Sequence, residues 1–202
     1  MAGAGMKDIK RRIKSVESTM QITKAMELVS SSKLRRAKEK VEKSRPYFNI
    51  LQETIQKVLD NTKSLKSVYT KEREIKNSLF IVIAGDRGLA GGYNANIIKA
   101  AVAEMEGKNP KIIPIGRKAS EYFGKRNYEV VEDYVNVAES LDFIDAALIT
   151  SVADEMYRDG KVDEVYLCYT EFVSALTQTP RTIKLLPLQM QKSPADIISS
   201  LE

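Results

Sequence analysis

The ten residues from Gly85 to Asn94 form the clearest pattern for chemistry. They read GDRGLAGGYN and lie between a strongly apolar segment and an amphipathic one. Glycine-rich turns between a strand and a helix hold phosphate groups in α/β proteins, because backbone N–H groups at the helix start face the ligand. The spacing, however, matches neither G-x-G-x-x-G nor a P-loop. We therefore expect a structural turn, with nucleotide binding as the alternative. Its residues are Gly85, Asp86, Arg87, Gly88, Gly91 and Gly92.

The remaining reactive side chains form no catalytic pattern. Histidine is absent, which removes the commonest general base and imidazole metal ligation. Glu132 and Asp133 are neighbours on an expected strand, so they point to opposite faces. Cys168, the single cysteine, lies in an apolar stretch without basic neighbours, which is typical of a buried thiol rather than a nucleophile. The sequence predicts no catalytic residue, no metal site and no cofactor bound by this chain.

The composition divides the chain into two halves. Of its 202 residues, 43% are hydrophobic and 29% are charged, which suits a folded protein. Between Met6 and Ala84 there is no glycine, whereas eight of the ten glycines follow from Gly85 onward. No apolar run approaches the roughly 20 residues of a membrane span. We predict a helical domain at 1–70 and an α/β domain at 71–192.

The first half carries one long helical pattern. Alternate steps of four and three residues from Ile9 to Leu65 define a largely apolar seam. Its 3.5-residue period predicts a helix that supercoils with a second helix. A helix from Met6 to Asp60 would be about 80 Å long, so part of it must project from a domain of this size. The seam comprises Ile9, Ile13, Val16, Met20, Thr23, Glu27, Ser30, Leu34, Ala37, Val41, Ser44, Phe48, Leu51, Ile55, Val58, Thr62 and Leu65.

The seam changes character between Thr23 and Ser30. Apolar side chains surround the helix here, and a turn that is apolar all round is buried on several sides. This segment is therefore predicted to contact a further partner. The apolar residues are Ile22, Ala25, Met26, Leu28 and Val29.

The same helix is strongly basic. Residues 6–45 carry a net charge of +8, against +5 for the whole chain. Such a helix suits nucleic acid, an anionic membrane or an acidic protein surface. A solvated face that keeps a long helix soluble is the simpler alternative.

The second half alternates between strands and helices. Strands are expected at 78–84, 111–115, 128–134, 162–172 and 181–188, and helices near 95–106, 117–125 and 142–157. This order predicts a Rossmann-like α/β domain with a mixed sheet of about five strands, covered on both faces. The last two strands are consecutive, so an antiparallel edge pair is expected. Ser193-Pro194-Ala195-Asp196 then predicts the start of another helix at 193–202.

Two segments resemble the gamma subunit of F-type ATP synthases. Residues 9–37, IKRRIKSVESTMQITKAMELVSSSKLRRA, are similar to the N-terminal shaft helix of that family. Residues 85–94 are similar to its first βα turn. The family's C-terminal shaft helix, which pairs with the N-terminal one, is expected to be largely missing after Glu202.

The resemblance implies a rotor subunit without catalytic residues. It would couple proton flow through the membrane sector to ATP synthesis or hydrolysis, with nucleotide and magnesium held by the alpha and beta subunits. The implied partners are the alpha and beta subunits, the epsilon subunit and the c-ring. The implied contact with beta is the segment Ile22–Glu27, with Lys24 and Met26 foremost and Ile22 and Glu27 beside them.

The implied location is peripheral, on the cytoplasmic face of a bacterial cell membrane. Neither nucleic-acid binding nor a membrane span is expected. Two alternatives remain: a basic coiled-coil protein that binds nucleic acid through residues 7–45, and an α/β enzyme that binds a nucleotide at Gly85–Asn94.

Overall fold

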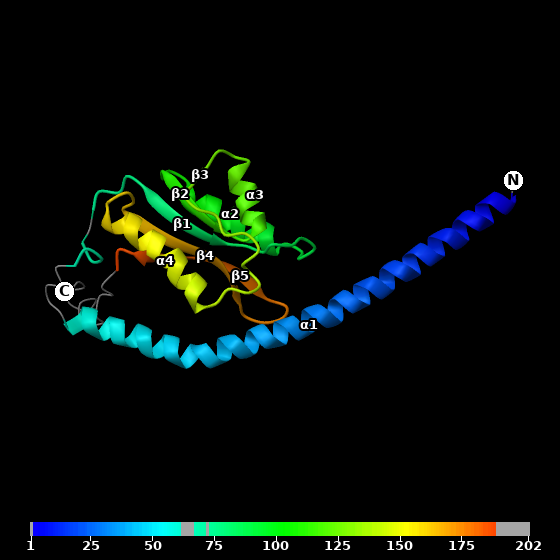
Figure 1. Ribbon diagram of the computed structural model, residues 1–202, viewed down its shortest axis with the longest axis horizontal. Helices are drawn as coiled ribbons and strands as arrows, with labels where there is room; N and C mark the ends of the chain where they lie inside the picture. Colours follow the sequence, from blue (N-terminus) through cyan, green and yellow to red (C-terminus); the bar gives the residue numbers. More distant parts are fainter. Residues whose placement is uncertain (1, 62–66, 72, 189–202) are drawn as a thin grey trace, which may run out of the picture. The chain divides into compact units, whose positions relative to one another are not determined.

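The structure is a computed structural model that describes residues 2–61, 67–71 and 73–188. The chain divides into two units, residues 1–62 and residues 63–202 (Figure 1). The domain limits expected from composition stay a prediction. The helix start expected at 193–202, and the seam positions Thr62 and Leu65, lie outside the described residues.

The first unit is one helix, α1, which runs without interruption from Ala2 to Asn61. Sixty residues of α-helix span about 90 Å, so the predicted long helix is confirmed. Pro46 lies inside it and removes one hydrogen bond to the preceding turn, yet α1 continues past it to Asn61. The helix as a whole curves gently (Figure 1). None of the described helices combines the length and the hydrophobicity needed to cross a bilayer.

The seam of α1 is exposed along its length. All its large apolar side chains within the described helix leave more than two-fifths of their surface accessible. A helix cannot bury such a stripe by itself, so the expected supercoil with a second helix stays a prediction. These side chains are Ile9, Ile13, Val16, Met20, Leu34, Val41, Phe48, Leu51, Ile55 and Val58.

The second unit is built on a mixed five-stranded sheet in the order β3-β2-β1-β4-β5. β1 is parallel to both β2 and β4, whereas β4 and β5 are antiparallel. The predicted mixed sheet and its antiparallel edge pair are therefore confirmed. The strands are Ser78–Ile83 (β1), Pro110–Ile115 (β2), Glu129–Val130 (β3), Glu164–Phe172 (β4) and Gln178–Leu186 (β5).

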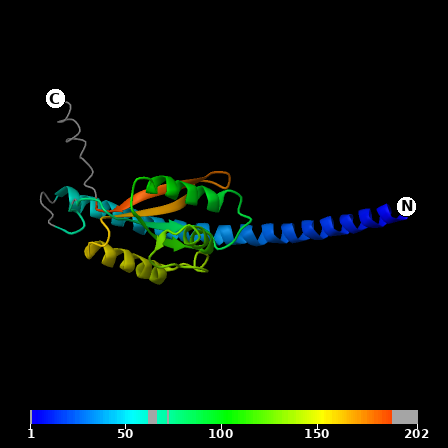
Figure 2. The ribbon, with the colours of Figure 1, turned by 90° about the horizontal axis from the view of Figure 1, so that it is seen from above.

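Helices cover both faces of this sheet (Figure 2). Alternate residues of β1 point to opposite faces: Phe80 packs with residues of α2 and α3, and Ile81 packs with residues of α4. Strands buried on both faces are apolar throughout, which explains the unbroken apolar sequence of β1. The helices are Tyr93–Met105 (α2), Arg117–Gly124 (α3) and Phe143–Arg158 (α4).

The third strand is shorter than predicted. The sequence indicated a strand over residues 128–134, but β3 contains Glu129 and Val130 alone. Val131 N still donates to Ile112 O, and Tyr134 N donates to Pro114 O. Between these two hydrogen bonds the chain after β3 advances by three residues, whereas β2 advances by two. The extra residue, together with the missing N–H of Pro114, interrupts the ladder.

Candidate functional site

The glycine turn predicted as structural follows β1 and precedes α2. Gly85 N donates to Asn94 Oδ1 at 2.7 Å, and Asn94 Nδ2 donates to the carbonyl oxygen of Arg87 at 3.0 Å. A single amide side chain from the first turn of α2 therefore bonds to two residues at the start of the glycine turn. The backbone N–H of Gly85 is thus not available to a phosphate.

Asp86 ties this turn to the two neighbouring βα connections. Its Oδ1 accepts hydrogen bonds from Arg117 N at 2.9 Å and from Asn136 N at 2.7 Å. Arg117 also donates through Nη2 to Asn136 Oδ1 at 2.6 Å. One carboxylate therefore joins the connections that follow β1, β2 and β3 at the carboxyl edge of the sheet.

Gly116 allows these connections to approach one another. Its φ of +92° lies in the region that favours glycine, and a Cβ there would stand 2.1 Å from the carbonyl oxygen of Ala84. Lys118 N in turn donates to Gly85 O at 3.0 Å. The contact between the two turns is thus made by backbone atoms and leaves no room for a ligand between them.

The rest of the turn presents side chains to solvent. Arg87 Nε lies 3.4 Å from Glu139 Oε1, while a Cβ on Gly88 or Gly91 would meet nothing within 4 Å. Gly92 is the N-cap of α2 and provides no side-chain cap. Across the described ranges, no group of three or more His, Cys, Asp or Glu side chains is placed to hold a metal ion. The hydrogen bonds of Gly85 and Asp86 therefore connect the glycine turn to α2 and to the connections that follow β2 and β3.

The same edge of the sheet carries exposed apolar side chains that our sequence analysis missed. Leu89, in the turn after β1, is 96% exposed and has a positive φ of 60°. Leu176, in the hairpin after β4, is 98% exposed. Because β1 and β4 are parallel, their carboxyl ends meet at one edge. A large apolar residue inside a turn was the available signal, since turns otherwise favour small and polar residues.

The predicted beta-contact residues lie on successive turns of α1. Ile22 is 59% exposed and Met26 49% exposed, and Lys24 and Glu27 are exposed as well. The side chains of all four residues are therefore accessible to a partner. Their contact with another subunit stays a prediction.

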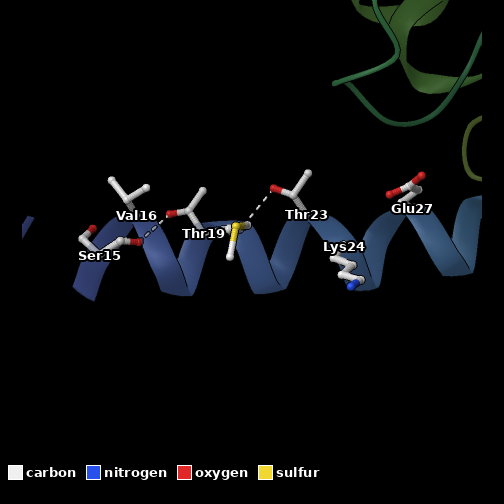
Figure 3. Close-up of a pocket in the computed structure, with 7 residues that line it drawn as sticks. Ser15, Val16, Thr19, Thr23, Lys24 and Glu27 are labelled. Carbon is white, nitrogen blue, oxygen red and sulfur yellow. Dashed lines mark hydrogen bonds between the residues drawn. The ribbon is translucent and has the colours of Figure 1, made fainter. Parts of the chain in front are cut away.

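An open groove runs along this part of α1, and Lys24 and Glu27 contribute to its lining (Figure 3). Thr19 Oγ1 donates to Ser15 O and Thr23 Oγ1 to Thr19 O, both at 2.9 Å. The hydroxyl groups are therefore satisfied within the helix, and Figure 3 shows each turned toward the preceding turn. Thr23 is one of the seam positions in the sequence. The tendency of Thr to bond the carbonyl four residues back was the signal for this arrangement. The lining residues are Ser15, Val16, Thr19, Met20, Thr23, Lys24 and Glu27.

The groove suits a helix rather than a small molecule. Ligand pockets surround most of the ligand's surface, which the side of one helix cannot do. Side chains at four-residue intervals instead form ridges and holes that receive the side chains of a second helix. The shape of this groove therefore favours packing against a second helix over binding of a small ligand.

Comparison with known proteins identifies the family. Residues 5–201 match the protein family described as ATP synthase. A protein named ATP synthase gamma chain, from Alkaliphilus metalliredigens, is 52% identical over 190 residues, or 94% of this chain. The chain belongs to the family of ATP synthase gamma chains. The family resemblance read from residues 9–37 and 85–94 is therefore confirmed.

Other gamma-chain relatives extend the comparison. The ATP synthase gamma chain of Acetobacterium woodii, named as sodium ion specific, is 41% identical over 93% of this chain. The chain spans 66% of the length of the Alkaliphilus relative and 62% of the Acetobacterium one. Among solved structures, one chain in the structure of the central stalk and c-ring of the Tetrahymena thermophila mitochondrial ATP synthase is similar. It matches 82% of this chain, and 72% of its own length, with a TM-score of 0.65 and 26% identity.

Proposed function

We propose that this chain is part of the central-stalk rotor subunit of an F-type ATP synthase. It would couple ion flow through the membrane sector, which we expect to be proton flow, to ATP synthesis or hydrolysis in the alpha/beta ring. Membership of the gamma-chain family and the 60-residue helix with its exposed seam support this role.

The role requires a shaft that transmits torque. A single helix of about 90 Å twists and bends easily, whereas two helices packed through a heptad seam brace each other. We infer that the seam from Ile9 to Val58 receives a second helix of the same subunit. The α/β unit, with its sheet buried on both faces, would then be the rigid foot through which torque enters.

The chain would contribute no catalytic group. Nucleotides and magnesium would be bound by the alpha and beta subunits. The segment Ile22–Glu27 would contact beta, with Lys24 and Met26 as its main residues.

The hydrogen bonds of Gly85 and Asp86 support a structural role for the glycine turn. Exposed ion pairs are typically worth under about 1 kcal/mol, which is weak enough for contacts to be exchanged as the shaft turns.

The remaining partners would be the epsilon subunit and the c-ring. Through them the chain would be held peripherally at the cytoplasmic face of a bacterial cell membrane. One relative is named as sodium ion specific, so the coupling ion is to be measured directly. ATP synthesis driven by a proton gradient in sodium-free buffer would support proton coupling.

Co-purification tests the proposal. The chain should be recovered with alpha and beta subunits in a defined complex, and ATP hydrolysis by that complex should turn a probe attached to the α/β unit. Salt-sensitive binding to duplex DNA that survives competition by the alpha/beta ring would instead favour a nucleic-acid-binding protein. Saturable ATP or NAD binding by the chain, abolished by substitutions in the glycine turn, would favour an enzyme.

A further inference from the structure

The chain between α1 and β1 is attached to the α/β unit at its far end. We call residues 67–71 and 73–77 the linker. Asp163 Oδ2 accepts hydrogen bonds from Lys76 N at 2.8 Å and from Asn77 N at 3.0 Å. Asp163 N in turn donates to Asn77 O at 2.9 Å. The last residues of the linker are therefore fixed to the residue that precedes β4.

Tyr69 connects the first part of the linker to α4. Its hydroxyl donates to Asp154 Oδ1 at 2.8 Å, across 85 positions of sequence. Its ring stacks on that of Tyr157, with the centroids 6.3 Å apart and 11° between the planes. Tyr157 is fully buried in the core between the sheet and α4. The hydrogen bond and the stacking together fix both the position and the orientation of the Tyr69 side chain.

Arg73 makes a second connection to the same helix. Its Nη1 donates to the carbonyl oxygen of Tyr157 at 2.8 Å, and its guanidinium carbon lies 4.3 Å from the centroid of the Tyr157 ring. This carbonyl lies in the last turn of α4, where the helix supplies no donor of its own and a cation is favourable. Cation–π attraction adds to the hydrogen bond. Tyr69 and Arg73 therefore contact the same buried residue of α4.

The outgoing chain meets the linker at Tyr69 as well. Leu188 N donates to Tyr69 O at 2.7 Å. β5 is antiparallel to β4, and Leu186 at its end pairs with Val165 near the start of β4. β1 is parallel to β4 and starts at the same edge of the sheet. The chain therefore enters and leaves the sheet at one edge, and a backbone hydrogen bond joins the two segments there.

These contacts decide where the linker is first attached. Each residue of an unattached segment has two soft backbone dihedrals, so a linker held at Asp163 alone could twist at every residue before Lys76. The bonds of Tyr69 and Arg73 to α4 move the first attachment back to Tyr69. They shorten the part of the chain that can twist between α1 and the α/β unit.

We propose that Tyr69 and Arg73 are positioning residues that transfer torque between α1 and the α/β unit, with α4 as the element that receives it. This inference rests on the proposed function, since torque exists only in a rotating subunit. α4 suits this role because its buried side chains pack against the sheet, and packed interiors deform little. These side chains are Ile149, Ala153, Met156 and Tyr157.

The test measures the angular fluctuation of a probe on the α/β unit in the complex of the chain with alpha and beta, stalled by a non-hydrolysable ATP analogue. Tyr69→Phe removes the hydroxyl, and Tyr69→Phe with Arg73→Met removes both polar contacts with α4. Asp154→Asn keeps an oxygen that can accept from Tyr69. The matched control is Tyr122→Phe with Arg126→Met, because the Arg126 guanidinium lies 3.8 Å from the centroid of the Tyr122 ring. Urea unfolding compares the stability of the variants.

The double variant of Tyr69 and Arg73 should raise the variance of the probe angle about twofold or more, because a segment that loses tertiary contacts opens locally. Tyr69→Phe alone should raise the variance by a smaller factor. Asp154→Asn should change it less than about 1.3-fold, since the hydrogen bond can still form. The control pair should also change it less than about 1.3-fold, because sites without shared partners act independently.

Two outcomes would overturn the inference while the rotor proposal stands. One is an unchanged variance for the double variant with a lowered urea midpoint, which would show that Tyr69 and Arg73 only stabilise the fold. The other is an equal rise in the control pair, which would show that the effect is not specific to the linker. If the double variant does not fold, Tyr69→Phe decides, and a variance equal to that of the unmodified chain overturns the inference. An unmodified chain that does not assemble with alpha and beta would instead reject the proposed function, and this inference with it.

Discussion

At the scale of single residues, a few side chains and one glycine determine how the segments of the α/β unit meet. Asp86 accepts two backbone N–H groups from separate connections, and Gly116 brings the second connection against Ala84. Cys168 is buried in the core between the sheet and α2, and burial raises the pKa of its thiol to about 11. The predicted burial of this cysteine is thereby confirmed.

Gly116→Ala should destabilise the α/β unit by about 3 kcal/mol or more. The new methyl group adds the strain of a positive φ to a backbone clash. Gly107→Ala is the matched control: its φ is +75°, but a Cβ there meets nothing within 4 Å, so about 1 kcal/mol is expected from strain alone. Urea unfolding, followed by tyrosine fluorescence, measures both. Equal losses would contradict the close approach seen at Gly116.

Met26→Lys should impair coupling in an assembled complex. If Met26 packs against an apolar partner surface, an ammonium group there costs far more to desolvate than an exposed ion pair returns. We expect ATP-driven ion pumping to fall by about half or more at unchanged ATP hydrolysis. Met26→Leu keeps the volume and should pump normally. Normal pumping by Met26→Lys would remove Met26 from the interface.

At the scale of elements, a buried charge cluster joins three strands of the sheet. Glu164, the first residue of β4, is 1% exposed. Its carboxylate accepts hydrogen bonds from Ser78 Oγ of β1 at 2.7 Å and from Tyr166 OH at 2.9 Å. Lys184 Nζ of β5 lies 2.8 Å away and Lys108 Nζ 3.7 Å away. A buried carboxylate with this many partners is stable as an ion.

The pKa of Glu164 lies below its ordinary value near 4.5. Burial alone would raise the pKa, but the hydrogen bonds from Lys184, Ser78 and Tyr166 together lower it by more. A carboxyl whose folded pKa is depressed binds fewer protons in the folded state than in the unfolded one. Its stabilising contribution is therefore present above the unfolded pKa and is lost as the pH falls through the folded pKa.

Glu164→Gln should reduce the free energy of unfolding by about 3 kcal/mol near neutral pH, because Lys184 would lose its buried partner. The difference from the unmodified chain should shrink as the pH falls below about 4.5, because the carboxyl of the unfolded chain becomes protonated there. It should be lost once the pH falls through the lower pKa of the folded carboxyl. Glu104→Gln changes a half-exposed partner of Lys108 and should cost less than about 0.5 kcal/mol. A difference that stays constant down to pH ~2 would contradict this assignment.

At the scale of the whole molecule, the chain combines an elongated helix with an α/β unit that has its own two-sided core. The buried residues of the core clusters on the two faces of the sheet lie between residues 79 and 168. Tyr69, Leu185 and Leu186 pack against one of these clusters. By contrast, α1 leaves its apolar seam accessible. The α/β unit therefore contains most of the burial that stabilises this chain.

Without partners, the chain should self-associate through α1. Exposed apolar stripes at heptad spacing pair readily in water, so sedimentation velocity should show dimers or larger species that increase with concentration. Met20→Gln with Leu34→Gln should shift the association constant down about tenfold or more, because it removes two apolar side chains from the seam. Ser18→Gln with Ser32→Gln, on the side of α1 opposite the seam, is the control. A chain that stays monomeric at all concentrations would show that the seam needs a specific partner.

Local periodicity was sufficient for the elements themselves. The 3.5-residue repeat predicted α1, and apolar runs separated by glycine and proline predicted four of the five strands to within a few residues. These features depend on neighbours in sequence, since a helix or a buried strand repeats its environment every few positions. The contact residues Ile22, Lys24, Met26 and Glu27 came from the same local pattern together with the family resemblance.

Tertiary structure alone decided which distant groups meet. Asp86 accepts hydrogen bonds from N–H groups that are 31 and 50 positions away in the sequence. Glu164 accepts one from Ser78, which is 86 positions away. β3 is cut short by its register against Pro114, a residue of another strand. Such pairings depend on strand order and register, which are set by the packing of the whole sheet and which no local periodicity encodes.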